Sequence, residues 1–391
     1  MLINFLQKLQ VRDTRYDMVF AYGALLFEIP KRLGTNAALD ASVMAMTSAI
    51  AGIEGNRKSP EILTRYGNAL RSLKTCLDDP VAVQSSSTLC AIYIIWICQA
   101  WICPDENMSL SGHSSGIVKL LATVPYKDSA DPFDRGILLT IAGPVVFESL
   151  VDPTIKLNPW LKKVVLENER PLVEDGSEDT VSLTENYQQR SQVGRVMSSV
   201  IRIPEFLQYN PELLNEIISI HRDVQKTCIK LHAKLIEVKL DFRNQVFLEM
   251  PKQPRIPISP NRLYAFYQKL YGIFLNIEVM FNGILQAYNP RDATLAARSS
   301  QICQEIIDLS LAALDLRPLG AGWIPICFIS AWAATSNEQS KALLEEAWYK
   351  CWATYSMLDL PSCGKQSEKL YQRLRQAVAN ANMIRPESTF W

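Results

Sequence analysis

Apolar residues recur at helical spacing along most of the chain. In the segment 61–77 they lie three and four positions apart, which places them on one stripe of a helix. The stripe consists of Ile62, Tyr66, Ala69, Leu70, Leu73 and Leu77. Ser59 and Pro60 precede it and are typical of a helix start, with the serine as N-cap and the proline in the first turn. We therefore predict a helix that begins at Pro60 and ends before Pro80.

A longer stripe lies in the segment 211–240. Its apolar positions are Leu214, Ile217, Val224, Cys228, Leu231, Leu235 and Val238, and His221 fills one gap in the series. The polar faces carry Arg222, Lys226, Lys230 and Lys234. The stripe spans only about four heptads, which favours a helix packed in a bundle over a dimerising coiled coil. We interpret His221 as a satisfied packing residue and not as a ligand.

Two segments interrupt the helical pattern. Residues 167–187 are rich in acidic side chains and contain Pro171 and Gly176, a composition typical of a solvated linker. Prolines recur at every third position in 251–260, which favours an extended connector and forbids helix. Helical patterning resumes in 261–288 and 291–316, and the aromatic residues of the first are interpreted as core.

No segment shows the sustained alternation that marks a β-strand, and no repeat of fixed period occurs. The sequence therefore predicts an all-α fold, a multi-helix array. We expect an N-terminal helical lobe at 1–166, an acidic linker at 167–187, and a C-terminal helical lobe at 188–391 that contains the proline-rich connector 251–260.

Composition and charge narrow the function classes. Hydrophobic residues make up 48% of the 391 residues, enough for a packed core. Forty basic and forty acidic residues cancel, whereas a free-standing DNA-binding domain usually shows a basic excess, so direct DNA contact is not expected. The longest apolar run, Leu89 to Cys103, is shorter than the roughly 18 to 20 residues of a membrane span. We predict neither a membrane segment nor secretion, and we interpret the nine scattered cysteines as reduced thiols.

One catalytic-looking motif occurs. Residues 112–116, Gly-His-Ser-Ser-Gly, match the G-x-S-x-G nucleophile elbow of hydrolases. The elbow requires a preceding strand, but a polar loop and a long apolar helix precede this segment. We therefore interpret the motif as the start of a helix through Ile117, Leu120 and Leu121, capped by Ser109 or Ser111.

No other pattern indicates a reactive site. The three histidines and the dispersed cysteines show no metal-ligand spacing, and no phosphate-binding or dinucleotide loop is present. We assign no catalytic, cofactor-binding, metal or DNA-binding residue and expect no cofactor. We predict no enzymatic activity, and an active site built from side chains scattered along the sequence is left as an alternative.

Several motifs occur in a fixed order along the chain. Pro30 to Asp40 follows the pattern P-x-x-L-G-x-N-x-A-L-D. After it come Tyr66-Gly67-x-Ala69-Leu70, Leu77-x-Asp79-Pro80, Thr88-Leu89-Cys90-Ala91, His113-x-x-Gly116-Ile117-x-x-Leu120-Leu121, Phe133-Asp134, Gly143 to Leu150, Arg317 to Trp323, and Ala331-Trp332-Ala333-Ala334. In this order they resemble the regulatory domain of one group of fungal zinc-cluster transcription factors, over about residues 15 to 355 with gaps.

The sequence departs from that family in two places. Leu110 stands where the family has a tryptophan. The family's DNA-binding module, in which six cysteines bind two zinc ions, normally lies upstream, but the first cysteine here is Cys76. The resemblance therefore implies the regulatory domain without the zinc cluster.

The resemblance leaves three alternatives for the function. The chain is part of a longer factor, or a free co-regulator of one, and in both cases regulates transcription, for example of a gene cluster for secondary metabolism. It would then act in the nucleus, or otherwise in the cytoplasm, through a zinc-cluster transcription factor, the transcription machinery or a small-molecule effector. In the third version the helical scaffold serves as an enzyme or binder for an apolar metabolite. An in-frame six-cysteine motif upstream of Met1 would establish the first.

Overall fold

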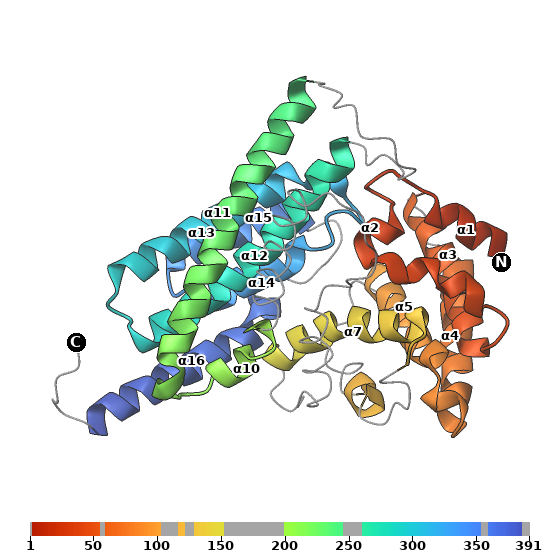
Figure 1. The fold of residues 1–391 in the computed structure, drawn as a ribbon, viewed down its shortest axis with the longest axis horizontal. Coiled ribbons are helices and arrows are strands. Elements are labelled where there is room, and N and C mark those ends of the chain that lie inside the picture. The colour runs from red at the N-terminus through yellow and green to blue at the C-terminus, as the bar shows by residue number, and fades with distance from the viewer. Residues whose placement is uncertain are drawn as a thin grey trace, which may run out of the picture. The chain divides into compact units, whose positions relative to one another are not determined.

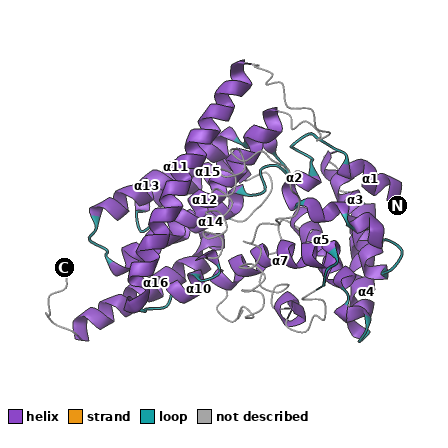
Figure 2. Cartoon of the chain, viewed as in Figure 1, coloured by secondary structure: helices purple, strands orange, loops and turns teal. Residues whose placement is uncertain are grey.

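The computed structural model describes residues 2–54, 59–102, 116–121, 129–151, 199–244, 260–352 and 359–384. Every regular element in these ranges is an α-helix or a short 3-10 helix, which confirms the predicted all-α fold (Figure 2). The predicted acidic linker and all but the last residue of the proline-rich connector lie outside the described residues.

The chain divides into two compact units. The first comprises Met1–Asn168, Arg317–Gly320 and Tyr355–Met357. The second comprises Glu169–Leu316, Ala321–Thr354 and Leu358–Trp391. Each unit is described below by itself.

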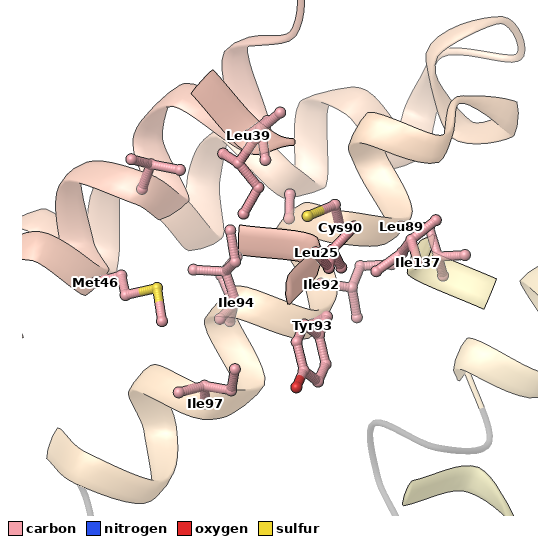
Figure 3. Packing of buried hydrophobic residues seen from close by; sticks show 14 of the residues in the cluster. Leu25, Leu39, Met46, Leu89, Cys90, Ile92, Tyr93, Ile94, Ile97 and Ile137 are labelled. Carbon is pink, nitrogen blue, oxygen red and sulfur yellow. The ribbon is translucent and has the colours of Figure 1, made fainter. Parts of the chain in front are cut away.

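The first unit is built around three helices that pack on one another, and shorter elements join them. The three are α3 (Ala37–Glu54), α4 (Pro60–Asp78) and α5 (Ser86–Ile102). The others are α1 (Leu2–Leu9), α2 (Met18–Tyr22), η1 (Ala24–Phe27), η2 (Ile29–Arg32), η3 (Ala82–Gln84) and α7 (Pro132–Val151). Because α5 is apolar all round, it needs cover on every side, and Figure 3 shows its side chains among those of η1, α3 and α7.

The start of α4 confirms the predicted cap. The helix begins at Pro60, and the Ser59 side chain accepts a hydrogen bond from the Glu61 amide at 3.2 Å. The predicted apolar stripe is wrong in part, because Leu70 and Leu77 are each 39% exposed. The fully packed face is Ala69, Leu73 and Cys76. Helix α4 packs on α3 and α5, and Leu70 and Leu77 of the stripe stay at the surface.

In the second unit, α12 (Pro260–Tyr288) is the central helix and packs most extensively against four other described helices (Figure 1). These are α11 (Leu214–Asn244), α13 (Ala293–Ala312), α14 (Ile324–Ala334) and α16 (Leu360–Ile384). The remaining elements are α10 (Ile203–Phe206), η4 (Pro211–Leu213), η5 (Leu314–Leu316) and α15 (Glu338–Trp352). The prediction that the aromatic residues of α12 are core is confirmed for Tyr271, Phe274 and Phe281, which are buried. Tyr264, Tyr267 and Tyr288 are only half-buried, and Phe266 is 48% exposed.

Glycines let the helices around α12 approach closely. A Cβ atom on Gly272 would lie 2.3 Å from Cζ3 of Trp323, and one on Gly364 would lie 2.5 Å from Cε3 of Trp332. Trp323 and Trp332 are both buried and belong to the late motifs of the sequence. Neither glycine could carry a side chain unless a tryptophan ring moved.

Helix α12 is also long and apolar enough, over Arg262–Tyr288, to cross a membrane by length and composition. The sequence analysis passed over this segment because its apolar run is interrupted. Of its most apolar window, 89% is buried inside the protein, which is the state of a core helix in a globular unit.

Candidate functional site

A cluster of charged and polar side chains lies inside the second unit, between α12 and α13. Arg298 donates to Glu278 from Nε to Oε1 at 2.6 Å and from Nη2 to Oε2 at 2.8 Å. Its Nη1 donates to Oε1 of Glu305 at 2.9 Å. The Tyr271 hydroxyl donates to the other oxygen of Glu305. The four side chains therefore form one chain of hydrogen bonds, which we call the α12–α13 cluster.

Helical spacing explains why these four residues meet. Tyr271 and Glu278 are seven positions apart on α12, and Arg298 and Glu305 are seven apart on α13. Seven residues make nearly two turns, so each pair occupies one face of its helix. A short connection joins the two helices, and they run antiparallel, so Glu278 meets Arg298 while Tyr271 meets Glu305.

The charges of the cluster are largely removed from water. The Glu278 side chain is fully buried, and those of Arg298 and Glu305 are 21% and 23% exposed. Burial by itself would lower the pKa of Arg298, but its hydrogen bonds to Glu278 and the two carboxylate charges raise that pKa overall. Burial and the bond to Glu305 likewise raise the pKa of Tyr271. Arg298 stays charged and Tyr271 stays protonated at neutral pH.

Helix α11 adds two histidines and a cysteine to this region. The Cys228 thiol is buried and hydrogen-bonded to Glu278; burial first, and then the Glu278 charge, raise its pKa. The His232 ring stacks on Tyr271 with 5.2 Å between ring centroids. His221 is 5% exposed, and its pKa is lowered by burial and by Arg298, against the opposing effect of Glu278.

The predicted role of His221 needs one correction. Its burial on the apolar face of α11 agrees with a packing residue, but its Nε2 atom has no hydrogen-bond partner among the described residues. The sequence pattern placed the imidazole on the core face and carried no information on which groups surround it. His221 is therefore a packing residue whose polar edge is not satisfied.

Further polar side chains of α12 are buried on either side of the cluster. The Asn282 and Gln286 amides both donate to the Leu295 carbonyl, at 3.0 and 2.8 Å. Asn276 is fully buried, and neither its Nδ2 nor its Oδ1 has a partner within the described part of the chain. Buried amides are usually hydrogen-bonded, so Asn276 is the least satisfied polar side chain of this core.

The cluster pairs its charges with one another, and this limits its chemistry. In the part of the chain that the structure describes, no group of three or more His, Cys, Asp or Glu side chains could hold a metal ion. Burial raises the pKa values of Cys90, Cys98, Cys228, Cys303 and Cys327, with that of Cys303 at about 12, so these thiols are protonated at neutral pH and poor nucleophiles. As built, the cluster fixes the register of α11, α12 and α13.

The sequence analysis missed this cluster. Its signal was present, because Glu278 is the single charged residue between Tyr271 and Tyr288. A carboxylate inside an apolar helix needs a paired cation when it is buried. The helical spacing placed Glu278 on one face of its helix, but it could not show that α13 would bring Arg298 next to this carboxylate.

The G-x-S-x-G segment lies largely outside the described residues. Gly116 is described and begins a helical stretch through residue 121. Ile117 and Leu121 of this stretch are buried in the core of the first unit, in agreement with the predicted helix. The chain's other two histidines, His221 and His232, both lie on helix α11.

In the first unit, residues of separate motifs contact one another. Asn36 caps α3: its Oδ1 accepts from the Leu39 amide at 3.0 Å, and its Nδ2 donates to Oγ1 of Thr88 in α5 at 2.9 Å. Thr88 in turn donates to the Ala82 carbonyl at 2.6 Å. Asp40 accepts from the Gly34 amide at 2.9 Å, which fixes the turn before the helix.

A second pair of motifs meets at the start of α7. Arg32 forms an ion pair with Asp131, and its guanidinium lies over the Phe133 ring, 5.1 Å from the centroid. A hydrogen bond at 3.0 Å from the Leu319 amide to the Arg15 carbonyl ties the late motif to the same unit. Motif residues from four parts of the chain thus take part in the framework of the first unit.

No family model, no curated protein and no solved structure matches this chain.

Proposed function

We propose that the chain is a transcription-regulator-like protein of the fungal-specific transcription factor type. It would influence transcription, for example of a secondary-metabolite gene cluster, through a zinc-cluster transcription factor, the transcription machinery or a small-molecule effector. Its site of action would be the nucleus.

The observation that carries the proposal is the meeting of motif residues in the first unit. Asn36 and Thr88 come from two motifs 52 positions apart and are hydrogen-bonded. Arg32, from the same motif as Asn36, lies over the ring of Phe133, which belongs to a third motif. Because these motif residues contact one another and stabilise the same unit, they support the interpretation of the ordered motifs as parts of one regulatory domain. The balanced charge fits action through other proteins better than direct binding to DNA.

A tethering experiment tests this role directly. The full chain is fused to a heterologous DNA-binding domain and expressed with a reporter gene that carries the matching operator. We expect reporter transcripts to change several-fold relative to the DNA-binding domain alone. The G67A variant is the matched control and should behave as the parent, because a Cβ at Gly67 meets no atom within 4 Å.

The proposal would be overturned by a fusion that is present at normal level in the nucleus and occupies the operator but leaves the reporter transcripts unchanged. If, in addition, deletion of the gene leaves the transcripts of the source cell unaltered, the chain is not a regulator of transcription. Co-purification of a tagged chain with a zinc-cluster transcription factor distinguishes the co-regulator version from the others.

A second function, binding of an apolar metabolite, has one observation in its favour. The fully buried Asn276 amide has no partner in the described residues, and polar groups inside an apolar interior are what orients a ligand in such a site. Native mass spectrometry of the purified full chain tests it. A co-purifying small molecule that is lost in N276L, but kept in the surface variant N68L, would favour this function over regulation by protein contacts alone.

A further inference from the structure

Helix α11 has two apolar faces. One face packs on α12 and contains the buried residues Val224, Cys228, Leu231, Leu235 and Val238, as the sequence pattern predicts. A second series, Ile229, Ala233, Ile236 and Leu240, is spaced by four, three and four positions and so forms its own stripe. We call these four residues the outer stripe.

The outer stripe is exposed. Ile229 is 69% exposed, Ile236 46% and Leu240 52%, and Ala233 is also at the surface. Figure 1 shows α11 lying over the other helices of its unit on the viewer's side. Single exposed apolar residues are ordinary, but a heptad-spaced row over about 17 Å of one helix is the pattern of a helix–helix interface.

The charges beside the stripe select its partner. Lys230 and Glu237 each follow an outer-stripe isoleucine by one position and are exposed. When two copies of α11 pair antiparallel about a twofold axis between residues 234 and 235, Ile229 faces Leu240 of the partner copy, and Ala233 faces Ile236 of the partner copy. Lys230 then lies opposite Glu237 of the partner copy, and symmetry repeats this pair.

The same comparison disfavours a parallel pair. In that arrangement Lys230 would lie opposite Gln225, and Glu237 opposite His232, so neither Lys230–Glu237 pair would form. The antiparallel register also places the small Ala233 against a large isoleucine, which lets the two helices interdigitate. Within its own helix, Glu237 accepts from Lys234 at 2.5 Å, and Lys230 of a partner copy would add a second cation to this carboxylate.

We propose that the outer stripe of α11 is a homodimerisation surface, on which two copies of this chain associate through antiparallel α11 helices. The inference does not depend on the proposed function. Two heptads of contact are small beside the roughly 800 Å² per partner of a standard interface, so the dimer should be a reversible one with a Kd on the order of micromolar.

Sedimentation of the purified full chain over a range of concentrations tests the proposal. We expect the parent to shift from monomer to dimer as its concentration rises to about 100 µM. The variant I229K/L240K should stay monomeric at every concentration. Its matched control is L63K/L70K on α4, which introduces the same charges at leucines that are 57% and 39% exposed, and it should dimerise like the parent.

Charge exchange identifies the register. K230E and E237K should each raise the dimer Kd by about tenfold, because two attractive pairs become two repulsive ones. The double exchange K230E/E237K restores both pairs and should return the Kd to near the parent value. Circular dichroism and the urea midpoint of each variant show that the monomer is still folded.

Three results would overturn the proposal. One is a parent chain that stays monomeric at about 100 µM. Another is a folded I229K/L240K variant that dimerises like the parent, which would place the interface elsewhere. The third is a double exchange that is as weak as either single change, which would exclude the antiparallel pairing of Lys230 with Glu237.

Discussion

Arg298 holds Glu278 by a two-pronged hydrogen bond, with Nε on one carboxylate oxygen and Nη2 on the other. The planar guanidinium matches the carboxylate, so this contact fixes both the distance and the rotation of α13 against α12. Because Glu278 is fully buried, its charge is compensated by Arg298 and not by water.

Loss of the Glu278 charge should destabilise the protein. We expect E278Q to lower the free energy of unfolding by about 3 kcal/mol, because it removes one partner of a buried pair and leaves Arg298 underpaired. Urea denaturation of the full chain measures the change. The control is E346Q, which removes an exposed carboxylate paired with Lys350 at 2.6 Å and should have no measurable effect. Equal losses in the two variants would contradict the structural role of the cluster.

His221 should make stability depend on pH. Burial lowers its pKa in the folded state below the ordinary value of about 6.5. Below about pH 6.5 the unfolded chain therefore takes up a proton that folded His221 does not, and the free energy of unfolding falls as pH falls. We expect H221Q to lose this part of the pH dependence between about pH 7 and 5, measured as the difference from the parent in urea titrations. H232Q, at the exposed ring on the same helix, should keep it; an unchanged slope in H221Q would contradict the prediction.

The glycines facing the tryptophans should not tolerate alanine. A Cβ at Gly272 would lie 2.3 Å from the Trp323 ring, so G272A should lower the free energy of unfolding by about 1 to 3 kcal/mol through overpacking. G67A, in an open part of α4, should instead be neutral or stabilise by up to about 1 kcal/mol, because alanine is the better helix former. Thermal or urea unfolding measures both. If the clash is the cause, W323L should recover part of the loss in the G272A background.

Asn36 and Thr88 should act as a coupled pair. N36A removes the cap of α3 and should lower the free energy of unfolding by about 1 kcal/mol, and further because the Thr88 hydroxyl loses the Asn36 amide as a donor. T88V removes the hydroxyl that accepts the hydrogen bond from Asn36. In a double-mutant cycle we expect a coupling energy of about 0.5 kcal/mol or more, since the two side chains are in direct contact. Strictly additive losses would mean that the hydrogen bond at 2.9 Å contributes nothing to stability.

The local elements were largely predictable because their signals are local. The cap at Ser59, the start of α4 at Pro60 and the core face of α11 follow from residues within one or two turns of each other. Even there, the pattern did not show how far the burial extends across an apolar stripe, because Leu70 and Leu77 lie at the surface while Ala69, Leu73 and Cys76 are buried.

The candidate site depended on contacts between helices. Glu278 stood out in the sequence as a lone charge, but its partner Arg298 is 20 positions away and follows only from the antiparallel packing of α12 and α13. The outer stripe of α11 was hidden for a related reason. Its isoleucines and leucine lie among lysines in the sequence, and their exposure is visible only once the other face of the helix is packed.

The sequence by itself determined that this protein is all-helical, because apolar spacing and capping residues act through the backbone of a few neighbouring residues. It also determined the face of α11 that packs in the core. The tertiary structure alone decided which faces meet: the glycine under each tryptophan, the cation beside Glu278, and the stripe of α11 left at the surface. Several partners are equally apolar or equally charged, so composition does not distinguish them. The shape of the side chains and the packing geometry of the helices decide which of them meet.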